Sequence, residues 1–400
     1  MTDFTSSPIY LDNAASTPIL DEVITEMLPY FKEQYGNPSS LHRFGRVAMK
    51  AIENARLHVS SLIGSKQHEI IFTSGGTEAN NLAIKGIAEL VRKTNPEKNC
   101  IITSAIEHES ILEAVRDMER KGFDVSYLPV TREAQVETSA LKETIVDGRT
   151  ALVSIMCSNN EVGTIQPISE LATITHQKGG LFHTDAVQAV GKMPIDVKHL
   201  GVDLLSVSAH KINGPKGVGA LYKREGLNLT ATIQGGGQES NLRSGTENVQ
   251  GIVGFGKACQ VASQMLVTYE TEVQALRNYM IDKVLRDIPN SRLNCQAQRR
   301  ISNIAHFTFL GVNGEDLIIK LDELGIAAST GSACSLRRQK PSHVLNAMGF
   351  SYAELTGSLR LSIGVLNTKE EIEQAVSLLS KAVRELRKLS PFELVSDKRN

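Results

Sequence analysis

Three short segments of the chain carry residue types that could do chemistry together. The first, residues 72–81, reads FTSGGTEANN, in which an apolar run leads through Ser-Gly-Gly-Thr into a helical pattern. Glycine lets the backbone approach a ligand, and the free amides and dipole of a helix N-terminus attract an anion. The segment predicts a phosphate site around Gly75 and Gly76, although a tight turn followed by a helix capped by Thr77 explains it equally well.

The other two segments place an acid and a lysine at the ends of apolar runs. Asp185 ends one run in HTDAVQAVG, and Lys211 follows the next in SVSAHKINGPKGVG. Ligands of open α/β sheets bind at the carboxyl ends of the strands. Taken singly, Asp185 is more simply a helix N-cap and Lys211 a surface lysine. Together with a phosphate site they supply what a pyridoxal 5′-phosphate enzyme needs: a lysine for the Schiff base and an acid to keep the pyridinium nitrogen protonated.

These segments lie in a stretch where apolar strands alternate with helices. Between residues 69 and 218 the runs EIIFTS, NCIITS, DVSYLPV, ALVSIMCS, GGLFHTDA and VDLLSVSA are rich in Ile, Val and Leu. Strands without polar alternation are buried on both faces, and helices between strands imply parallel crossovers. We therefore expect an α/β fold with a mainly parallel sheet flanked by helices.

The pattern changes after this stretch. Residues 249–287 form one long helical segment, and mixed strands and helices follow. We expect a large domain over residues 17–262 and a smaller α+β domain formed by residues 1–16 and 263–400. In the last helix of the smaller domain, apolar residues recur at spacings of three and four and give one stripe that can pack on a small sheet: Ile372, Val376, Leu379, Val383 and Leu386.

Composition disfavours several classes of protein. With 43 basic and 44 acidic residues the formal net charge is -1 and aromatic residues make up 5%, so neither a nucleic-acid nor a membrane partner is indicated. No apolar run approaches the roughly 20 residues of a membrane span, and the N-terminus does not resemble a signal peptide. Five cysteines without a C-x-x-C pair favour a reducing cytoplasmic compartment, with neither a disulfide framework nor a bound metal.

Beyond these patterns, the sequence resembles the NifS/IscS-type cysteine desulfurases, which are class V aminotransferase-like enzymes of fold type I. The resemblance runs in order from Tyr10 to about Pro391, and its most specific motifs are SAHK (208–211), RSGTEN (243–248) and STGSAC (329–334). It implies an aspartate aminotransferase-like fold, a pyridoxal 5′-phosphate cofactor and a catalytic cysteine on the smaller domain. The other matching motifs are YLDNAASTP, GNPSSLH, TSGGTEANN, EH, NNEVG, TDAVQ, GPKG, GGGQE and LRLSIG.

The resemblance also implies a role for each matching residue. Lys211 would carry the cofactor and move protons, Asp185 would pair with its pyridinium nitrogen, and His108 would stack on its ring. Arg360, whose planar fork suits a carboxylate, would bind the substrate with help from Asn13. The remaining implied contacts are Asn160 and Gln188 at the ring hydroxyl, and Gly76, Thr77, Ser208, His210 and Thr246 at the phosphate, with Thr246 coming from the second subunit of a homodimer.

Cys334 identifies the reaction that the resemblance implies. It lies among small residues, in a form similar to the group I branch, so its thiolate could move and attack sulfur. L-cysteine would leave as L-alanine, and the Cys334 persulfide would pass to an acceptor protein for iron-sulfur cluster assembly or for thiolation of tRNA, DNA or a cofactor. Cys100, Cys157 and Cys259 fall in apolar patterns typical of buried structural thiols, whereas Cys295 stays undecided.

Two other interpretations stay open at this point. A class V aminotransferase or lyase would keep the chemistry of Lys211 and Asp185 without using Cys334. A non-catalytic scaffold that docks sulfur-acceptor proteins would need none of these residues. Cofactor colour separates the scaffold from both enzymes, and a Cys334→Ala variant separates the two enzymes from each other.

Overall fold

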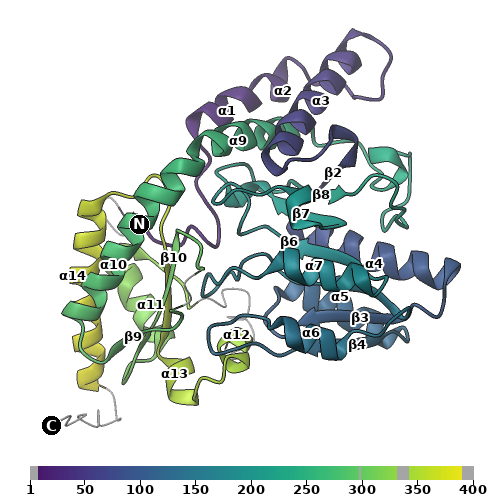
Figure 1. Cartoon of the computed structure of the whole chain (residues 1–400). Helices are drawn as coiled ribbons and strands as arrows, with labels where there is room; N and C mark the ends of the chain where they lie inside the picture. Colours follow the sequence, from purple (N-terminus) through teal and green to yellow (C-terminus); the bar gives the residue numbers. More distant parts are fainter. Residues whose placement is uncertain (1–7, 297–298, 331–341, 390–400) are drawn as a thin grey trace.

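A seven-stranded sheet forms the centre of the computed structural model, which describes residues 8–296, 299–330 and 342–389 (Figure 1). The strand order is β2-β8-β7-β6-β5-β3-β4. Only β8 in this sheet runs antiparallel to its neighbours; the other neighbouring pairs are parallel, which confirms the expected mainly parallel sheet. The strands are β2 (Ile70–Thr73), β3 (Cys100–Ser104), β4 (Asp124–Leu128), β5 (Thr150–Ser154), β6 (Leu181–Asp185), β7 (Leu204–Ser208) and β8 (Gly219–Lys223).

Burial differs between the two edge strands of the sheet. Strands β2, β3, β5 and β7 are buried at every residue. Strands β2 and β4 both lie at an edge, but β2 is covered by the 3-10 turn at Glu239–Asn241, where the Glu239 carboxylate accepts a hydrogen bond from the Phe72 N–H, whereas only the last residue of β4 is buried. The expectation that the DVSYL run is buried on both faces is therefore wrong. Strand β8 begins at the last residue of the glycine-rich GPKGVG segment, and the apolar runs of the sequence did not identify it.

Helices cover both faces of this sheet (Figure 1). One face packs on α4 (Gly76–Thr94) and α5 (Glu109–Arg120). The other packs on helices that include α3 (Arg43–Ile63), α7 (Ile168–Gln177) and α9 (Val249–Thr268). The shorter helices of this part are α1 (Asp21–Met27), α2 (Pro29–Lys32), α6 (Thr138–Thr144) and α8 (Val197–Leu200), with 3-10 turns at Gln67–Glu69, Ala209–Lys211 and Glu239–Asn241.

A second hydrophobic core forms around a three-stranded antiparallel sheet. Helix α9 leads into it through a π-helical turn at Tyr269–Val273, so residues 249–287 are helical throughout, as expected. Four residues of the predicted stripe on the last helix are buried in this core, and Leu386 is partly buried against it. The elements are α10 (Gln274–Asp287), β9 (Ser291–Leu293), β10 (Ile304–Phe309), α11 (Gly314–Glu323), α12 (His343–Ala347), α13 (Tyr352–Thr356), β12 (Ser358–Ser362) and α14 (Lys369–Leu389).

The N-terminal segment joins the two cores. Strand β1 (Ile9–Tyr10) pairs in parallel with β11 (Ile326–Ala327), and Ile9 belongs to the second core. A few residues later Val23 belongs to the first core. Because α9 runs without interruption through residue 262, the domain boundaries at residues 16 and 262 stay predictions. None of the described helices combines the length and apolar character that crossing a bilayer requires.

Candidate active site at the carboxyl ends of the strands

The predicted site residues converge where the parallel strands end. Asp185 is the last residue of β6, and Ser208 is the last residue of β7, directly before the 3-10 turn that contains Lys211. Helices α4 and α5 begin at Gly76 and Glu109, directly after the turns that follow β2 and β3. Because β2, β3, β6 and β7 point the same way, all of these residues come to one edge of the sheet.

Asp185 is held as a buried acceptor, with 6% of its surface exposed. The Asn80 side-chain amide donates to Oδ2 at 2.7 Å, and the Val187 backbone N–H donates to Oδ1 at 3.0 Å. Donors on both oxygens hold the carboxyl group in one orientation. This arrangement suits an acid that must keep a protonated ring nitrogen in place.

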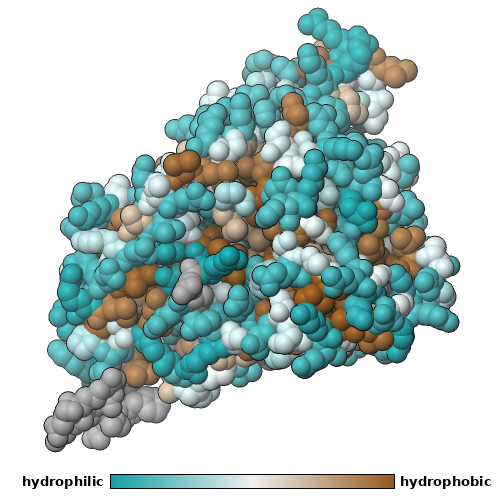
Figure 2. All heavy atoms as spheres, viewed as in Figure 1, coloured by the Kyte–Doolittle hydropathy of each residue, from teal (hydrophilic) through white to brown (hydrophobic). Residues whose placement is uncertain are grey.

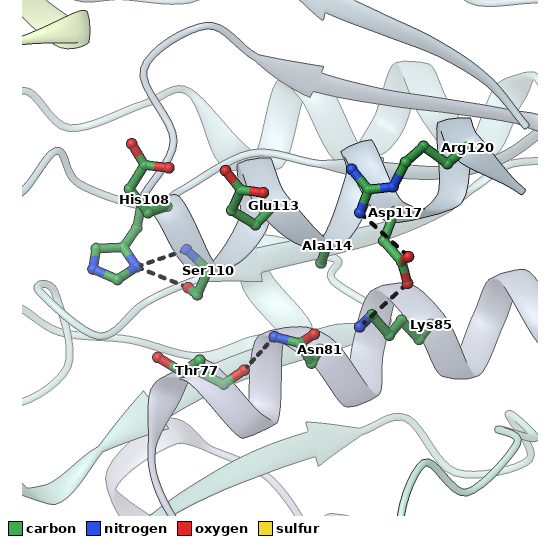
Figure 3. A pocket seen from close by; sticks show the side chains of 10 residues that line it. Thr77, Asn81, Lys85, His108, Ser110, Glu113, Ala114, Asp117 and Arg120 are labelled. Atoms are coloured by element: carbon green, nitrogen blue, oxygen red, sulfur yellow. Dashed lines mark hydrogen bonds and ion pairs between the residues drawn. The ribbon is translucent and has the colours of Figure 1, made fainter. Parts of the chain in front are cut away.

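His108 is connected to Asp185 through a chain of polar side chains. It caps α5 by accepting a hydrogen bond from the Ser110 backbone N–H, and its Nδ1 also lies 2.8 Å from Ser110 Oγ (Figure 3). Asn80 donates to the same Ser110 hydroxyl at 2.8 Å and to Asp185. Burial lowers the pKa of His108 even though Asp185 opposes this shift. The ring is thus a fixed, neutral surface, as stacking on a cofactor requires.

Lys211 lies against the N-terminal segment. Its ammonium donates to the Ala14 carbonyl at 2.6 Å and to the Ala15 carbonyl at 2.7 Å. The Gln188 amide nitrogen donates to that same Ala14 oxygen at 2.9 Å. The Thr17 backbone N–H and hydroxyl both donate to the carbonyl of His210. The YLDNAAST segment is therefore part of the site, although it is distant from SAHK in the sequence.

The start of α4 forms a cradle that has room only for glycine. A Cβ on Gly76 would lie 2.8 Å from Val187 Cγ2 and 3.6 Å from Ser208 Cβ. Gly75, directly before the helix, has φ +153°, in the region that favours glycine. Burial, together with the neighbouring Lys211, lowers the pKa of His210 to about 4. A lysine, a fixed buried acid and a glycine-lined helix N-terminus fit pyridoxal 5′-phosphate.

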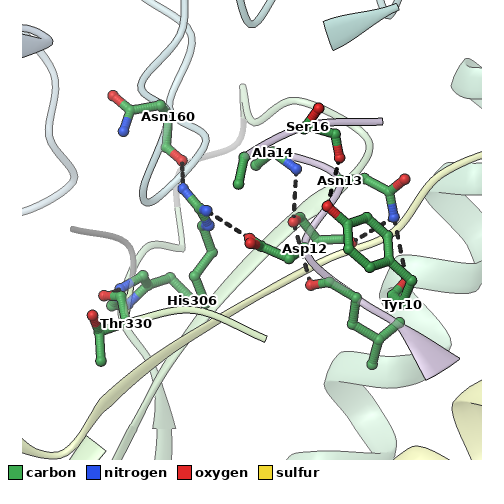
Figure 4. A network of polar contacts seen from close by, with 12 residues as sticks. Tyr10, Asp12, Asn13, Ala14, Ser16, Asn160, His306 and Thr330 are labelled. Atoms are coloured by element: carbon green, nitrogen blue, oxygen red, sulfur yellow. Dashed lines mark hydrogen bonds and ion pairs between the residues drawn. The ribbon is translucent and has the colours of Figure 1, made fainter. Parts of the chain in front are cut away.

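Arg360 lies on β12, in the small sheet. Two residues that its guanidinium contacts, Asp12 and Asn160, are labelled in Figure 4. Only 3% of the Arg360 side chain is exposed; one end of the guanidinium pairs with Asp12 Oδ1 at 2.8 Å, and the other donates to the Asn160 carbonyl at 2.7 Å. Asn13 does not face Arg360: its amide donates to the carbonyls of Tyr10 and Ser362. The part of Asn13 in substrate binding therefore stays a prediction without a supporting contact.

Cys334 lies outside the described residues, but both flanks of its segment can be followed. On one side, Ser329 and Arg360 exchange backbone hydrogen bonds. On the other, the Ser342 hydroxyl donates to Glu161 Oε2 at 2.5 Å, and His343 Nε2 donates to the Glu107 carbonyl at 2.9 Å. The two flanks are thus attached to β12 and to Glu107, the residue that precedes His108.

The other four cysteines are buried. Burial raises the pKa of the Cys157 thiol to about 12 and raises the pKa values of Cys100 and Cys259 as well. Such thiols do not ionise near neutral pH and are poor nucleophiles. The expectation that Cys100, Cys157 and Cys259 are buried structural thiols is confirmed, and Cys295 joins them.

A hollow of about 530 Å³ opens between α4 and α5 beside this site. His108 and Thr77 line the end nearest the strand ends, and Lys85 and Asp117 form an ion pair farther along the helices (Figure 3). Thr246, predicted to come from a second subunit, is exposed. No described contact joins Thr246 to the start of α4 of its own chain, so its role stays a prediction.

Sequence reasoning missed several polar residues of the site. Asn80 and Ser110 connect Asp185 with His108, and Asp12 pairs with Arg360. A signal for Asn80 was present: it stands on the buried face of α4 among alanines and leucines, where a polar residue needs a buried partner. Asp12 gave no such signal, because its partner is brought close only by the fold.

Comparison with known proteins gives a consistent result. The aminotransferase class-V family model matches residues 9–375. Cysteine desulfurase IscS from Dictyoglomus turgidum is 46% identical over 385 residues, which are 96% of this chain and 97% of the relative. A solved NifS-like protein superposes with a TM-score of 0.88 at 37% identity, covering 94% of this chain and 100% of the other. The structure titled SspA in complex with cysteine gives 0.79 at 36% identity, with coverage of 89% and 98%.

Proposed function

We infer how this site works from the premise that the chain belongs to the class-V aminotransferase family and is a pyridoxal 5′-phosphate-dependent cysteine desulfurase. The cofactor, when bound, acts as an electron sink that weakens the bonds around the amino-acid carbon attached to it. The observation that carries the assignment of roles is the convergence of Lys211, Asp185 and Arg360 beside both flanks of the Cys334 segment.

The residues proposed to hold the cofactor follow from the contacts described above. Lys211 would attach it, and Asp185, held in place by the Asn80 amide, would pair with its ring nitrogen. His108, buried and neutral, would lie against the ring. The other proposed contacts are Gln188 and Asn160 at the ring oxygen, and Gly76, Thr77, Ser208, His210 and a partner's Thr246 at the phosphate.

The remaining residues would act on L-cysteine. Arg360 presents a buried guanidinium whose geometry suits the substrate carboxylate. Lys211, once released from the cofactor, is the base that can take the α-proton. The Cys334 thiolate would form an S–S bond with the substrate sulfur while the bond from that sulfur to Cβ breaks. The three-carbon remainder takes up protons and leaves as L-alanine, and the sulfur stays on Cys334 as a persulfide.

A homodimer is part of the same proposal. Apolar side chains are exposed together on the projection formed by α1–α3: Phe31 is 60% exposed and Leu41 is 90% exposed, with Leu28, Tyr35 and Phe44 close in sequence (Figures 1 and 2). Exposed apolar patches of this kind mark interaction surfaces.

A Phe31→Asp/Leu41→Asp variant should be monomeric by light scattering, whereas Ile319→Asp, an exposed residue on α11, should leave the dimer intact. A dimeric double variant would contradict this surface.

The persulfide would be handed to an acceptor protein in the cytoplasm. The acceptor serves iron-sulfur cluster assembly or the thiolation of tRNA, DNA or a cofactor. A reducing compartment suits this role because the chain depends on an available Cys334 thiol and carries four further buried thiols. Incubating the enzyme, loaded from ³⁵S-cysteine, with candidate acceptors identifies the protein that receives label.

The roles of Lys211 and Cys334 can be tested with two variants. Lys211→Ala should lose the visible absorption of the attached cofactor. Cys334→Ala should keep that absorption but form less than about 1% of the wild-type sulfide and alanine from L-cysteine, because no thiolate removes the sulfur. Cys100→Ala is the matched control, since its thiol is buried away from the site. Full desulfurase activity of Cys334→Ala would overturn the proposed sulfur transfer and favour a lyase that does not use Cys334.

A further inference from the structure

Lys192 is a fully buried lysine that the mechanism above does not use. It is 1% exposed and lies in the turn that follows β6, the same turn that begins with Asp185 and contains Gln188. Its ammonium donates to Gln188 Oε1 at 3.2 Å. In the part of the chain that the structure describes, no carboxylate lies within ion-pair distance of Lys192 Nζ.

The electrostatic surroundings of Lys192 are unfavourable for a cation. Burial, together with the neighbouring charges of Lys211 and Arg360, lowers the pKa of Lys192 to about 7. A buried ammonium without a counter-ion costs several kcal/mol, and an apolar residue such as Met would fill the same space without that cost. Packing alone therefore does not explain a lysine here, whereas an anion bound nearby would.

The contacts of Lys192 determine the orientation of Gln188. An ammonium can only donate a hydrogen bond and a carbonyl can only accept one. Lys192 on one side and the Ala14 carbonyl on the other therefore hold the amide with Oε1 toward Lys192 and Nε2 toward Ala14. Lys211 donates to the same Ala14 oxygen. The Gln188 amide nitrogen and the Lys211 ammonium therefore lie beside the same carbonyl oxygen.

The turn is shaped to bring Lys192 close to the Lys211 segment. Gly191 has φ +75°, in the left-handed region that favours glycine. A Cβ at this position would lie 2.7 Å from Ile212 Cγ2, directly after Lys211 in the chain. Both the positive φ and the lack of space therefore restrict position 191 to glycine.

We propose that Lys192 is a positioning residue: it holds the Gln188 amide nitrogen toward the ring oxygen of the cofactor and stabilises that oxygen as an anion. The inference rests on the proposed attachment of the cofactor to Lys211. It assigns Lys192 no contact with the substrate. It also explains why a cation is retained among Lys211, Arg360 and His210, since the cofactor would supply the negative charge that the protein lacks there.

The test is a pH titration of the visible absorption of the holoenzyme. Lys192→Met keeps the side-chain volume but removes the positive charge and the hydrogen bond to Gln188 Oε1. The anionic ring oxygen is then less stable, and the proton on the Lys211 linkage is therefore held more tightly. We expect the midpoint to rise by about one pH unit, a tenfold shift in the proton equilibrium. Gln188→Leu should raise it by a similar amount, and the double variant should shift by less than the sum of the two single variants, because part of the effect of Lys192 is exerted through Gln188.

Controls separate this role from a structural one. Lys192→Gln keeps a donor for Gln188 Oε1 and should shift the midpoint less than Lys192→Met, and it serves if the Met variant does not fold. Lys223→Met, at a partly buried lysine bonded to the Leu227 carbonyl, should leave the midpoint unchanged. A folded, cofactor-loaded Lys192→Met or Lys192→Gln enzyme with the wild-type midpoint would overturn the proposal, as would additive shifts in the double variant. A Lys211→Ala protein that keeps its visible absorption band would instead contradict the attachment of the cofactor to Lys211. The two failures can therefore be told apart.

Discussion

The two sides of the site are built differently. On the side of the large sheet, Asp185 is held by neutral donors, and the chain of hydrogen bonds through Asn80 and Ser110 reaches His108. On the side of the small sheet, Arg360 is held by a charge, the carboxylate of Asp12. In the proposed mechanism, the neutral network leaves Asp185 available to the cofactor, whereas Arg360 must divide its guanidinium between Asp12 and the substrate carboxylate. On this proposal the first side holds a ligand that stays bound, and the second binds one that is exchanged at every turnover.

The largest effect is expected from a substitution on the small-sheet side of the site alone. Arg360→Lys removes the planar fork that reaches both Asp12 and the Asn160 carbonyl. We expect kcat/KM for L-cysteine to fall about a hundredfold through a higher KM, because a lysine cannot bind a carboxylate in the same two-pronged way. The absorption of the bound cofactor should stay as in wild type. A variant that loses cofactor instead would show that the two sides are not independent.

A smaller effect is expected from breaking the large-sheet side. Asn80→Leu removes the donor to Asp185 and to Ser110. Leaving buried acceptors without this donor costs about 1–3 kcal/mol, so the dissociation constant of the cofactor should rise about tenfold or more by equilibrium dialysis. The KM for L-cysteine of the saturated enzyme should change little. Asn81→Leu, one residue along α4 with its amide bonded to the Thr77 carbonyl of its own helix, is the matched control.

The smallest effect is expected on the free energy of unfolding in acid. It can be compared between two buried histidines, one in the large sheet and one in the small sheet. Burial lowers the pKa of His183, on β6, and of His306, on β10, to about 3. Because the folded chain keeps both rings neutral while the unfolded chain protonates them below about pH 6.5, stability is lost as the pH falls through that value. Each ring should contribute a loss of up to about 1.4 kcal/mol per pH unit between pH 6 and 4.

The measurement is urea unfolding at several pH values for wild type, His183→Gln and His306→Gln. Each variant should show a shallower loss of unfolding free energy in acid than wild type. Glu107, whose pKa burial raises to about 8, acts in the opposite direction, because its folded form holds a proton that the unfolded form releases above about pH 4.5. Wild-type slopes in both variants would show that these rings are not kept neutral by the fold.

Much of the fold was predictable because the signals are local. Six of the seven strands of the large sheet, the long helix over residues 249–287 and the apolar stripe of α14 follow from the periodicity of apolar residues. The burial of β4 was mispredicted because the sequence of a strand does not tell which other segments of the chain will cover it; the edge strand β2 is buried and the edge strand β4 is not. The Gly-Gly pair at the start of α4 was informative because the positive φ of Gly75 is a local property of the turn, whereas the lack of room for a Cβ on Gly76 comes from Val187 and Ser208, which only the fold brings close.

The sequence by itself determined which chemical groups are present: a lysine, an acid and a glycine-lined helix start in one α/β layer. Only the tertiary structure decided which of them meet. Asn80 and Asp185 are 105 residues apart, Lys211 and Ala14 are 197 apart, and Arg360 and Asp12 are 348 apart. Such contacts depend on the order and register of the strands, which bring segments together across the whole chain. No local pattern carries that information, which explains why the partners of Asp12, Asn80 and Lys192 emerged only from the folded molecule.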